Sequence, residues 1–145
     1  MQILVDADAC PVKQIIVRLA KQRNIPVTML IDTSHELNDG YSRIITVDKH
    51  TDSVDYALMG LLTREDIVVT QDFGLAAMVI GKGAKAVSQN GLIFTDANMD
   101  KLLLERHIGQ KIRRGGGRAK GPSKRTKDDD ARFEAAFERL LAEIE

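Results

Sequence analysis

The sequence has a single cysteine and no long apolar run, and each of these features excludes a class of protein. One cysteine, Cys10, excludes an intrachain disulfide framework and is typical of a reducing cytosol. No apolar stretch approaches the ~20 residues of a membrane span. The short apolar start runs into Asp6 and Asp8 without a basic flank, unlike a signal peptide. We therefore expect a cytoplasmic protein, and its 145 residues predict one domain with a substantial core.

Charge sums to zero but is placed unevenly along the chain. Residues 1–108 carry 11 Lys and Arg against 14 Asp and Glu, residues 109–127 carry 8 against none, and residues 128–145 carry 2 against 7. The middle stretch, GQKIRRGGGRAKGPSKRTK, is glycine-rich and favours a polyanion such as nucleic acid as its partner. It is equally consistent with a solvated linker to a last helix, and both interpretations stay open.

Apolar residues follow strand and helix patterns in alternation. Strands are predicted over residues 2–6, 27–31, 43–47, 66–70 and 84–87, with Asn90-Gly91 as a hairpin turn into 92–94. Helices are predicted from Pro11 through Ala20 and over residues 54–62, 74–80, 96–108 and 128–144. This alternation predicts an α/β fold, a three-layer sandwich with a mainly parallel central sheet. We expect an α/β domain over 1–108, a basic glycine-rich linker over 109–127, and a C-terminal helix over 128–145 that packs on the domain.

Acidic residues follow buried strands, or open a helix, at three places. They are Asp6 and Asp8 after the first strand, Asp52 and Asp55 at the start of the helix through 54–62, and Asp72 after strand 66–70. Because the carboxyl ends of parallel strands share one edge of a sheet, we expect these acids to converge there. Converging carboxylates repel one another, and hard divalent cations such as Mg²⁺ prefer oxygen ligands. The sequence therefore predicts a Mg²⁺ or Mn²⁺ site at this edge.

Helix capping is the competing interpretation for some of these acids. Asp52, Asp72 and Asp96 each stand where an N-cap or first-turn residue is expected. A cap explains one acid after a strand but not two on the same side of it, which favours a functional role for Asp6 and Asp8. Turn contexts predict structural roles for Asp32, Asp39 and Asp48, while His50, close to Asp52, is a further candidate for substrate contact.

Longer motifs add a resemblance that covers nearly the whole chain. They are VDADACPV (5–12), TDSVDYAL (51–58), DIVVTQDFGLAAMVIGKGA (66–84), NGLIFTDANM (90–99), GGGRAKGP (115–122) and DDDARFEAAFERLL (128–141). With them the sequence resembles the YaiI/YqxD family of bacterial proteins of unknown function, which is similar in fold and acid placement to PIN-like nucleases. The resemblance implies that Asp6 is the first acid of the PIN-like pattern, Asp55 or Asp52 the second, and Asp72, in its Thr-x-Asp context, the third. PIN-like sites usually add a fourth acid one helix later, and here Asp8 or Asp96 remains for it.

The leading functional hypothesis is a Mg²⁺- or Mn²⁺-dependent ribonuclease. In it Asp6, Asp55 and Asp72 are catalytic, and Asp8 and Asp52 help them to hold the ion. The side chains assigned to binding the RNA backbone are Thr70, Lys13, Arg18, Arg113, Arg114 and Arg118.

Two alternatives from other classes remain. A strand followed by Asp-x-Asp also begins phosphohydrolases of the haloacid-dehalogenase kind, with Asp6 as nucleophile and Asp8 as acid and base. The other alternative is a non-catalytic RNA-binding or regulatory protein, in which residues 109–127 carry the function and the acids serve only a structural metal. Binding by such a protein would weaken steeply with salt.

Overall fold

The structure is a computed structural model that describes residues 1–32, 37–50, 53–116 and 124–144. Asp52 and Arg118 lie outside these residues. The elements, in chain order, are β1 (Ile3–Asp6), α1 (Lys13–Gln22), β2 (Val27–Asp32), β3 (Arg43–Val47), α2 (Ser53–Leu61), β4 (Ile67–Val69), α3 (Phe73–Gly81), β5 (Lys85–Val87), α4 (Asp96–Arg114) and α5 (Lys127–Ile144). Strands and helices alternate along much of this order, which confirms the predicted α/β class.

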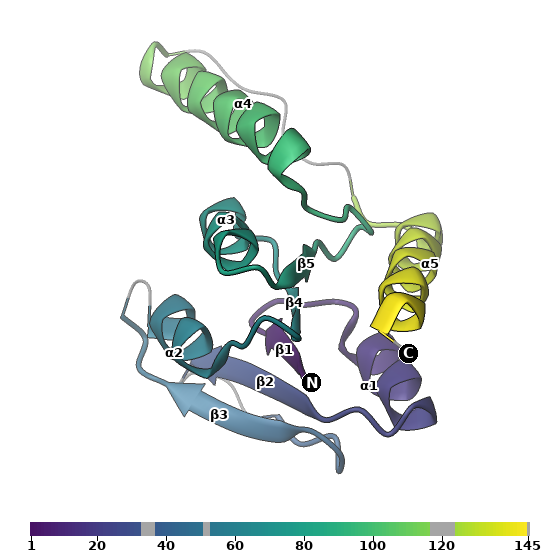
Figure 1. Cartoon of the computed structure of the whole chain (residues 1–145). Helices are drawn as coiled ribbons and strands as arrows, with labels where there is room; N and C mark the ends of the chain where they lie inside the picture. Colours follow the sequence, from purple (N-terminus) through teal and green to yellow (C-terminus); the bar gives the residue numbers. More distant parts are fainter. Residues whose placement is uncertain (33–36, 51–52, 117–123, 145) are drawn as a thin grey trace.

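The five strands form one sheet in the order β3-β2-β1-β4-β5, and every pairing in it is parallel. Helices cover both faces, so the molecule is a three-layer sandwich (Figure 1). Neighbouring positions of the central strand β1 face opposite layers, because side chains alternate along a strand. Ile3 and Val5 pack with α1 and α5, whereas Leu4 packs with α2, α3 and the start of α4. The α5 layer includes the stacked rings of Phe133 and Phe137, 5.2 Å between centroids.

The order of the strands creates a switch point beside β1. The chain runs from β1 through α1 to β2 and β3 on one side, then crosses through α2 to β4 and β5 on the other. Connections therefore leave β1 and β4 in opposite directions. In open parallel sheets the crevice outside the carboxyl ends of two such strands is where ligands bind. Asp6 is the last residue of β1, and Thr70 follows the last residue of β4.

Two elements differ from the sequence prediction. Helix α4 does not end at Ile108 but continues through Arg114, so the first six residues of the segment 109–127 are helical. The turn at Asn90-Gly91 forms, with Gly91 at φ +87°, but residues 92–94 are not a strand: Ile93 makes one isolated antiparallel bridge to Val87. Among the helices that the structure describes, none has the length and apolar character needed to cross a bilayer.

Candidate functional site

Thr70 links the acids at the ends of β1 and β4. Its hydroxyl donates a hydrogen bond to Oδ2 of Asp6 (2.9 Å) and accepts one from the backbone N–H of Asp72 (3.0 Å). Only 2% of Thr70 is exposed, and the backbone N–H of Thr70 donates to the carbonyl of Val87 on β5. The hydroxyl is therefore held in place by the sheet, and it fixes both the orientation of the Asp6 carboxylate and the path of the chain into α3.

Asp72 is the N-cap of α3. Its Oδ1 accepts a hydrogen bond from the backbone N–H of Leu75 (3.1 Å), which satisfies one of the donors left open at the start of a helix. A Cβ at Gly74 would lie 3.2 Å from the same oxygen, so the small residue there leaves room for the cap. The helix cap thus uses one carboxylate oxygen of Asp72, Oδ1, and is compatible with a second role for the carboxylate.

The carboxylate of Asp6 has a raised pKa. Burial, which penalises the charged form, is the largest cause. The hydrogen bond from Thr70 acts in the opposite direction and lowers the pKa, while the negative charges of Asp72 and Asp8 raise it further. Asp6, Asp8 and Asp72 therefore form an electrostatically coupled group at the switch point.

Asp8 lies between two small hollows at this edge of the sheet. Its carboxylate accepts a hydrogen bond from the backbone N–H of Asp32 at the end of β2 (3.2 Å). One hollow, of about 40 Å³, has room for a water molecule or a bare ion. Its lining comprises Asp6, Asp8, Cys10, Val69, Thr70, Gln71 and Gln89. The other hollow, of about 250 Å³, is lined by Asp8, Asp32, Asp48, Lys49, His50, Val54, Asp55 and Asp72.

The structure thus brings together most of the acids that the sequence singled out, and it adds others. Asp6, Asp8, Asp55 and Asp72 all line these two hollows. Turn contexts had predicted purely structural roles for Asp32 and Asp48, which also line the larger hollow, as do Lys49 and His50. The pattern that predicted Asp6, an acid at the carboxyl end of a strand, also applies to them, because Asp32 ends β2 and Asp48 directly follows β3.

Gln71 and Gln89 are site residues that sequence reasoning missed. Oε1 of Gln71 accepts a hydrogen bond from the backbone N–H of Gln89 (2.9 Å), which ties the segment after β4 to the turn after β5. Arg125 also holds that turn, donating to the Gln89 carbonyl (2.8 Å) and to Oδ1 of Asn90 (2.7 Å). Arg125 also pairs with Asp130 on α5. One cation of the segment 109–127 is therefore part of the scaffold around the site.

The carboxylate oxygens are the donor type that a divalent cation prefers, but they do not form a complete set of protein ligands around one point. Within the described ranges, no three His, Cys, Asp or Glu side chains are grouped closely enough to hold a metal ion. Mg²⁺ keeps several waters and is usually held by one or two carboxylates together with the phosphates of a substrate. Asp6 and Asp72, or Asp6 and Asp8, fit that smaller requirement. Cys10 offers no thiolate to the site, because burial raises the pKa of its thiol.

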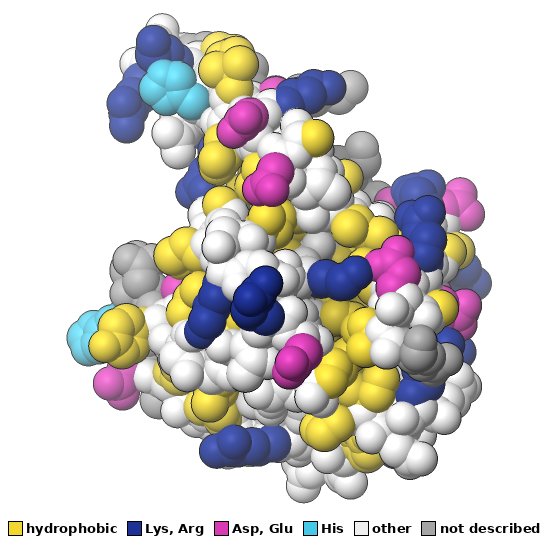
Figure 2. All heavy atoms as spheres, viewed as in Figure 1, with side chains coloured by type: hydrophobic (Ala, Val, Ile, Leu, Met, Phe, Trp, Pro, Cys, Tyr) yellow, Lys and Arg dark blue, Asp and Glu magenta, His cyan; other side chains and the backbone are white. Residues whose placement is uncertain are grey.

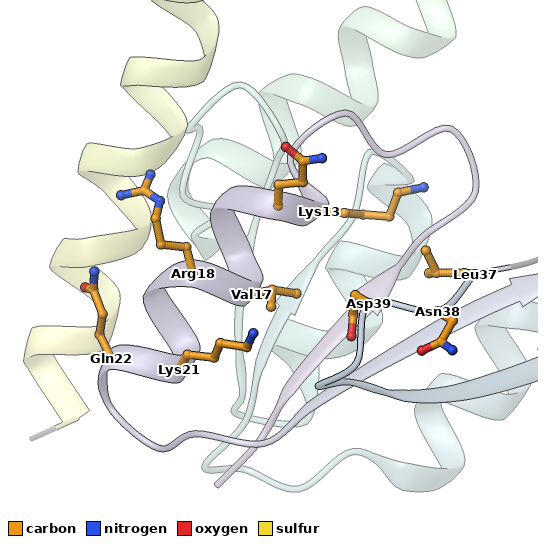
Figure 3. Close-up of a pocket in the computed structure, with 9 residues that line it drawn as sticks. Lys13, Val17, Arg18, Lys21, Gln22, Leu37, Asn38 and Asp39 are labelled. Carbon is orange, nitrogen blue, oxygen red and sulfur yellow. The ribbon is translucent and has the colours of Figure 1, made fainter.

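The predicted phosphate-binding residues are spread over three parts of the molecule. Thr70 lies at the acids themselves, and Lys13 lies beside them: its Nζ donates to the carbonyl of Ala7, the residue between Asp6 and Asp8 (3.3 Å). Arg18 points toward α5, where it forms an ion pair with Glu134 (Figure 3). Arg113 and Arg114 end α4, which extends away from the sheet (Figure 1).

A hollow of about 640 Å³ lies beside Lys13, between α1 and residues 37–39. Lys13, Val17 and Lys21 follow one another at four-residue spacing along its helical wall, and Leu37, Asn38 and Asp39 line the opposite wall (Figure 3). The Nζ of Lys21 lies 5.5 Å from the centre of the Tyr41 ring. This hollow is larger and more basic than the two at the acids, and Lys13 marks the end nearer to them.

Comparison with known proteins assigns the chain to a family. A family model described as "Uncharacterized BCR, YaiI/YqxD family" matches residues 4–143. A UPF0178 protein of Ruminiclostridium cellulolyticum is 66% identical over 137 residues, covering 94% of this chain and 90% of the relative. One from Clostridium acetobutylicum is 53% identical over 143 residues, covering 97% of each chain. No solved structure matches. This chain therefore belongs to the YaiI/YqxD, or UPF0178, family of uncharacterised bacterial proteins.

Proposed function

We propose that the chain is a phosphodiesterase that cleaves RNA with the help of Mg²⁺ or Mn²⁺. The observation that carries this proposal is the coupled group of Asp6, Asp8 and Asp72 at the switch point, with Thr70 fixed between two of them. A carboxylate whose pKa is raised by neighbouring negative charges, as that of Asp6 is, is stabilised by a cation, and Mg²⁺ is usually bound together with the phosphates of a substrate. The PIN-like comparison made from the sequence motifs suggests the same chemistry.

In this proposal each residue has a definite task. Asp6 and Asp72 would hold the cation, and Asp8, which lines both hollows, would be a further ligand or would accept a proton from the attacking water. Thr70 keeps the Asp6 carboxylate aimed at the crevice. A bound divalent ion would polarise the phosphoryl group and lower the pKa of the attacking water. Asp55, at the start of α2, lines the larger hollow and completes the acidic wall; the proposal also keeps Asp52 as a ligand.

Substrate binding is proposed to run along α1. Lys13 and Lys21 line the same hollow and are eight residues apart, which is about 12 Å along a helix. That interval is longer than the spacing of adjacent phosphates in a single strand, and it fits two phosphates that are separated by one further phosphate. Arg18 contributes less to this surface, because its guanidinium already pairs with Glu134. A cytoplasmic location, where RNA is abundant and Cys10 stays reduced, suits this substrate.

The test is cleavage of labelled single-stranded RNA with Mn²⁺ by the wild type, by the double variant Asp6→Asn/Asp72→Asn, and by Asp100→Asn. Asp100 is exposed on α4 and serves as a control for a carboxylate outside the site. We expect the wild type and Asp100→Asn to cleave and the double variant to lose nearly all activity, because two of the carboxylates that would hold the catalytic ion are gone. Intact RNA with the wild type, or equal cleavage by the double variant, would contradict the proposal.

A phosphohydrolase with Asp6 as nucleophile is the second candidate. The observation that favours it is that Asp6 and Asp8 line the same small hollow, as an Asp-x-Asp mechanism requires. Hydrolysis of generic phosphate esters with a phosphoryl group trapped on Asp6 would select this candidate over the nuclease. RNA binding that falls steeply with salt, without hydrolysis of either substrate, would select the non-catalytic alternative.

A further inference from the structure

Helix α4 leaves the body of the protein after its first two turns. Met99 is buried, and Leu102 packs against the cluster formed with α2 and α3. From Leu103 to Gly116 no residue is buried. Figure 1 shows this part of α4 extending beyond the sheet as an arm. At 19 residues the helix is about 28 Å long, and more than half of it has no core contact of its own.

The arm carries an apolar stripe that faces solvent. Leu104, Ile108 and Ile112 are spaced four residues apart, which places them on one side of the helix. Their exposed fractions are 57%, 48% and 43%, although large aliphatic side chains are among the residues most often buried. The stripe lies on the opposite side of α4 from Leu102, so the α4 packing on the body leaves it uncovered.

Charge along α4 is divided between its two halves. Residues 96–105 hold three acids, Asp96, Asp100 and Glu105, against one lysine, whereas residues 106–114 hold four cations and no acid. Figure 2 shows blue side chains at the far end of the arm and magenta ones nearer the body. Two such helices laid antiparallel place the acidic half of each against the basic half of the other. The same arrangement is self-complementary, as a two-fold interface requires.

We propose that the α4 arm is a self-association surface, and that its occupant is the α4 arm of a second copy of this chain. In the antiparallel pair Leu104 of one copy faces Ile108 of the other, and Ile112 extends the apolar contact on each side. Helices of this length bury less than the ~800 Å² per partner of a standard interface. The dimer is therefore reversible and forms as the protein concentration rises. This inference does not depend on the proposed nuclease activity.

Sedimentation velocity over a range of concentrations tests the proposal. The wild type should move from the monomer toward twice its mass, whereas Leu104→Glu/Ile108→Glu should stay monomeric. Leu103→Glu is the matched control, because Leu103 is exposed on the same helix but lies away from the stripe; it should associate like the wild type. Circular dichroism confirms that each variant is folded. A wild type that stays monomeric up to about 1 mM, or a dimer that the double variant keeps, overturns the proposal.

Cysteine cross-linking distinguishes an antiparallel pair from a parallel one. In a Cys10→Ala background, a mixture of the Leu104→Cys and Ile108→Cys variants should form a mixed disulfide dimer under mild oxidation, because these two positions face each other across the two-fold axis. Ala97→Cys lies about 9 residues from that axis, so its two copies are roughly 27 Å apart and should not react. Disulfide dimers of Ala97→Cys that form as efficiently as the mixed dimer would mean a parallel pair and would overturn the arrangement proposed here.

Discussion

At the scale of single residues, Asp6 is the acid at the switch point whose pKa is raised, first by burial and then by neighbouring charges. Burial and the negative charges of Asp72 and Asp8 raise its pKa, and only the Thr70 hydroxyl acts against them. The folded state therefore holds the Asp6 proton more tightly than the unfolded chain does. Stability from this group is complete below the unfolded pKa, near 3.8, and is lost as the pH rises through the folded value.

Asp6→Asn should consequently stabilise the metal-free protein at neutral pH. The amide keeps an oxygen that can accept the hydrogen bond from Thr70, and it removes a charge that is partly buried among two others. The gain should shrink as the pH is lowered through 3.8, because below that pH the wild-type carboxyl becomes neutral in both states. Urea unfolding of both proteins between pH 3.5 and pH 7 measures this. A variant that is less stable than the wild type at every pH would show that the charge of Asp6 stabilises the fold.

Thr70→Val should destabilise the protein by about 1–3 kcal/mol, because it removes a buried hydroxyl that donates to Asp6 and accepts from the N–H of Asp72. It should also raise the pKa of Asp6 further, since the lowering hydrogen bond is gone. Thr70→Ser keeps the hydroxyl and is the matched control. Denaturant unfolding compares the three proteins. Equal losses in the valine and serine variants would assign the effect to packing of the methyl group rather than to the hydroxyl.

At the scale of elements, the first turn of α3 combines a structural and a proposed functional role in one residue. Asp72→Ala removes the cap on the N–H of Leu75 and should lower stability by about 1 kcal/mol, whereas Asp72→Asn caps about as well as aspartate and removes only the charge. In the proposed site, Asp72→Asn should therefore keep apo stability equal or higher and lose the rise in Tm that Mn²⁺ gives the wild type. Thermal unfolding with and without Mn²⁺ measures both effects. An undiminished Mn²⁺ shift in Asp72→Asn would leave Asp72 as a cap only.

The docking of α5 depends on the absence of a side chain at Gly91. This residue has φ +87°, and a Cβ on it would lie 2.5 Å from the carbonyl oxygen of Arg132 in α5. Gly91→Ala should therefore lower stability by more than the ~1–2 kcal/mol of backbone strain alone and loosen α5. Gly40→Ala is the control, because Gly40 also has a positive φ (+73°) but nothing within 4 Å of its Cβ position. Amide hydrogen exchange in α5 reports the effect, and equal protection in both variants would argue against the close approach.

The elements also show how far the sequence alone could predict this protein. The acids after β1 and β4 were predictable, because the carboxyl ends of parallel strands share an edge whatever the strand order. Asp32 and Asp48 were missed because their turn contexts have an ordinary explanation, and only the order β3-β2-β1-β4-β5 places them on the same hollow as Asp8. Gly109 and the cations after it favoured an end of α4 at Ile108, although the helix continues through Arg114.

The pairing of Arg18 lay beyond sequence reasoning for a different reason. Arg18 lies on the first helix of a domain with acids at one edge of its sheet, and such a cation is a reasonable candidate for phosphate binding. Its ion pair with Glu134, however, depends on where α5 docks, 116 residues later in the chain. The same holds for Arg125 of the segment 109–127, which has a structural role because it donates hydrogen bonds to Gln89 and Asn90. Local patterns predict elements, whereas such long-range pairs follow from the packing of those elements.

At the scale of the whole molecule, negative charge gathers at the carboxyl edge of the sheet and positive charge beside it along α1. This division suits a polyanion that lies on the lysines while a cation bridges one of its phosphates to the acids. Family membership leaves the activity open, so the central claim is the cation site itself. A crystal structure of the wild type soaked with Mn²⁺ tests it most directly, through the anomalous signal of the metal. The account predicts a peak within coordination distance of Asp6 and of Asp72 or Asp8. Full-occupancy Mn²⁺ elsewhere on the protein, with none at Asp6, would contradict it.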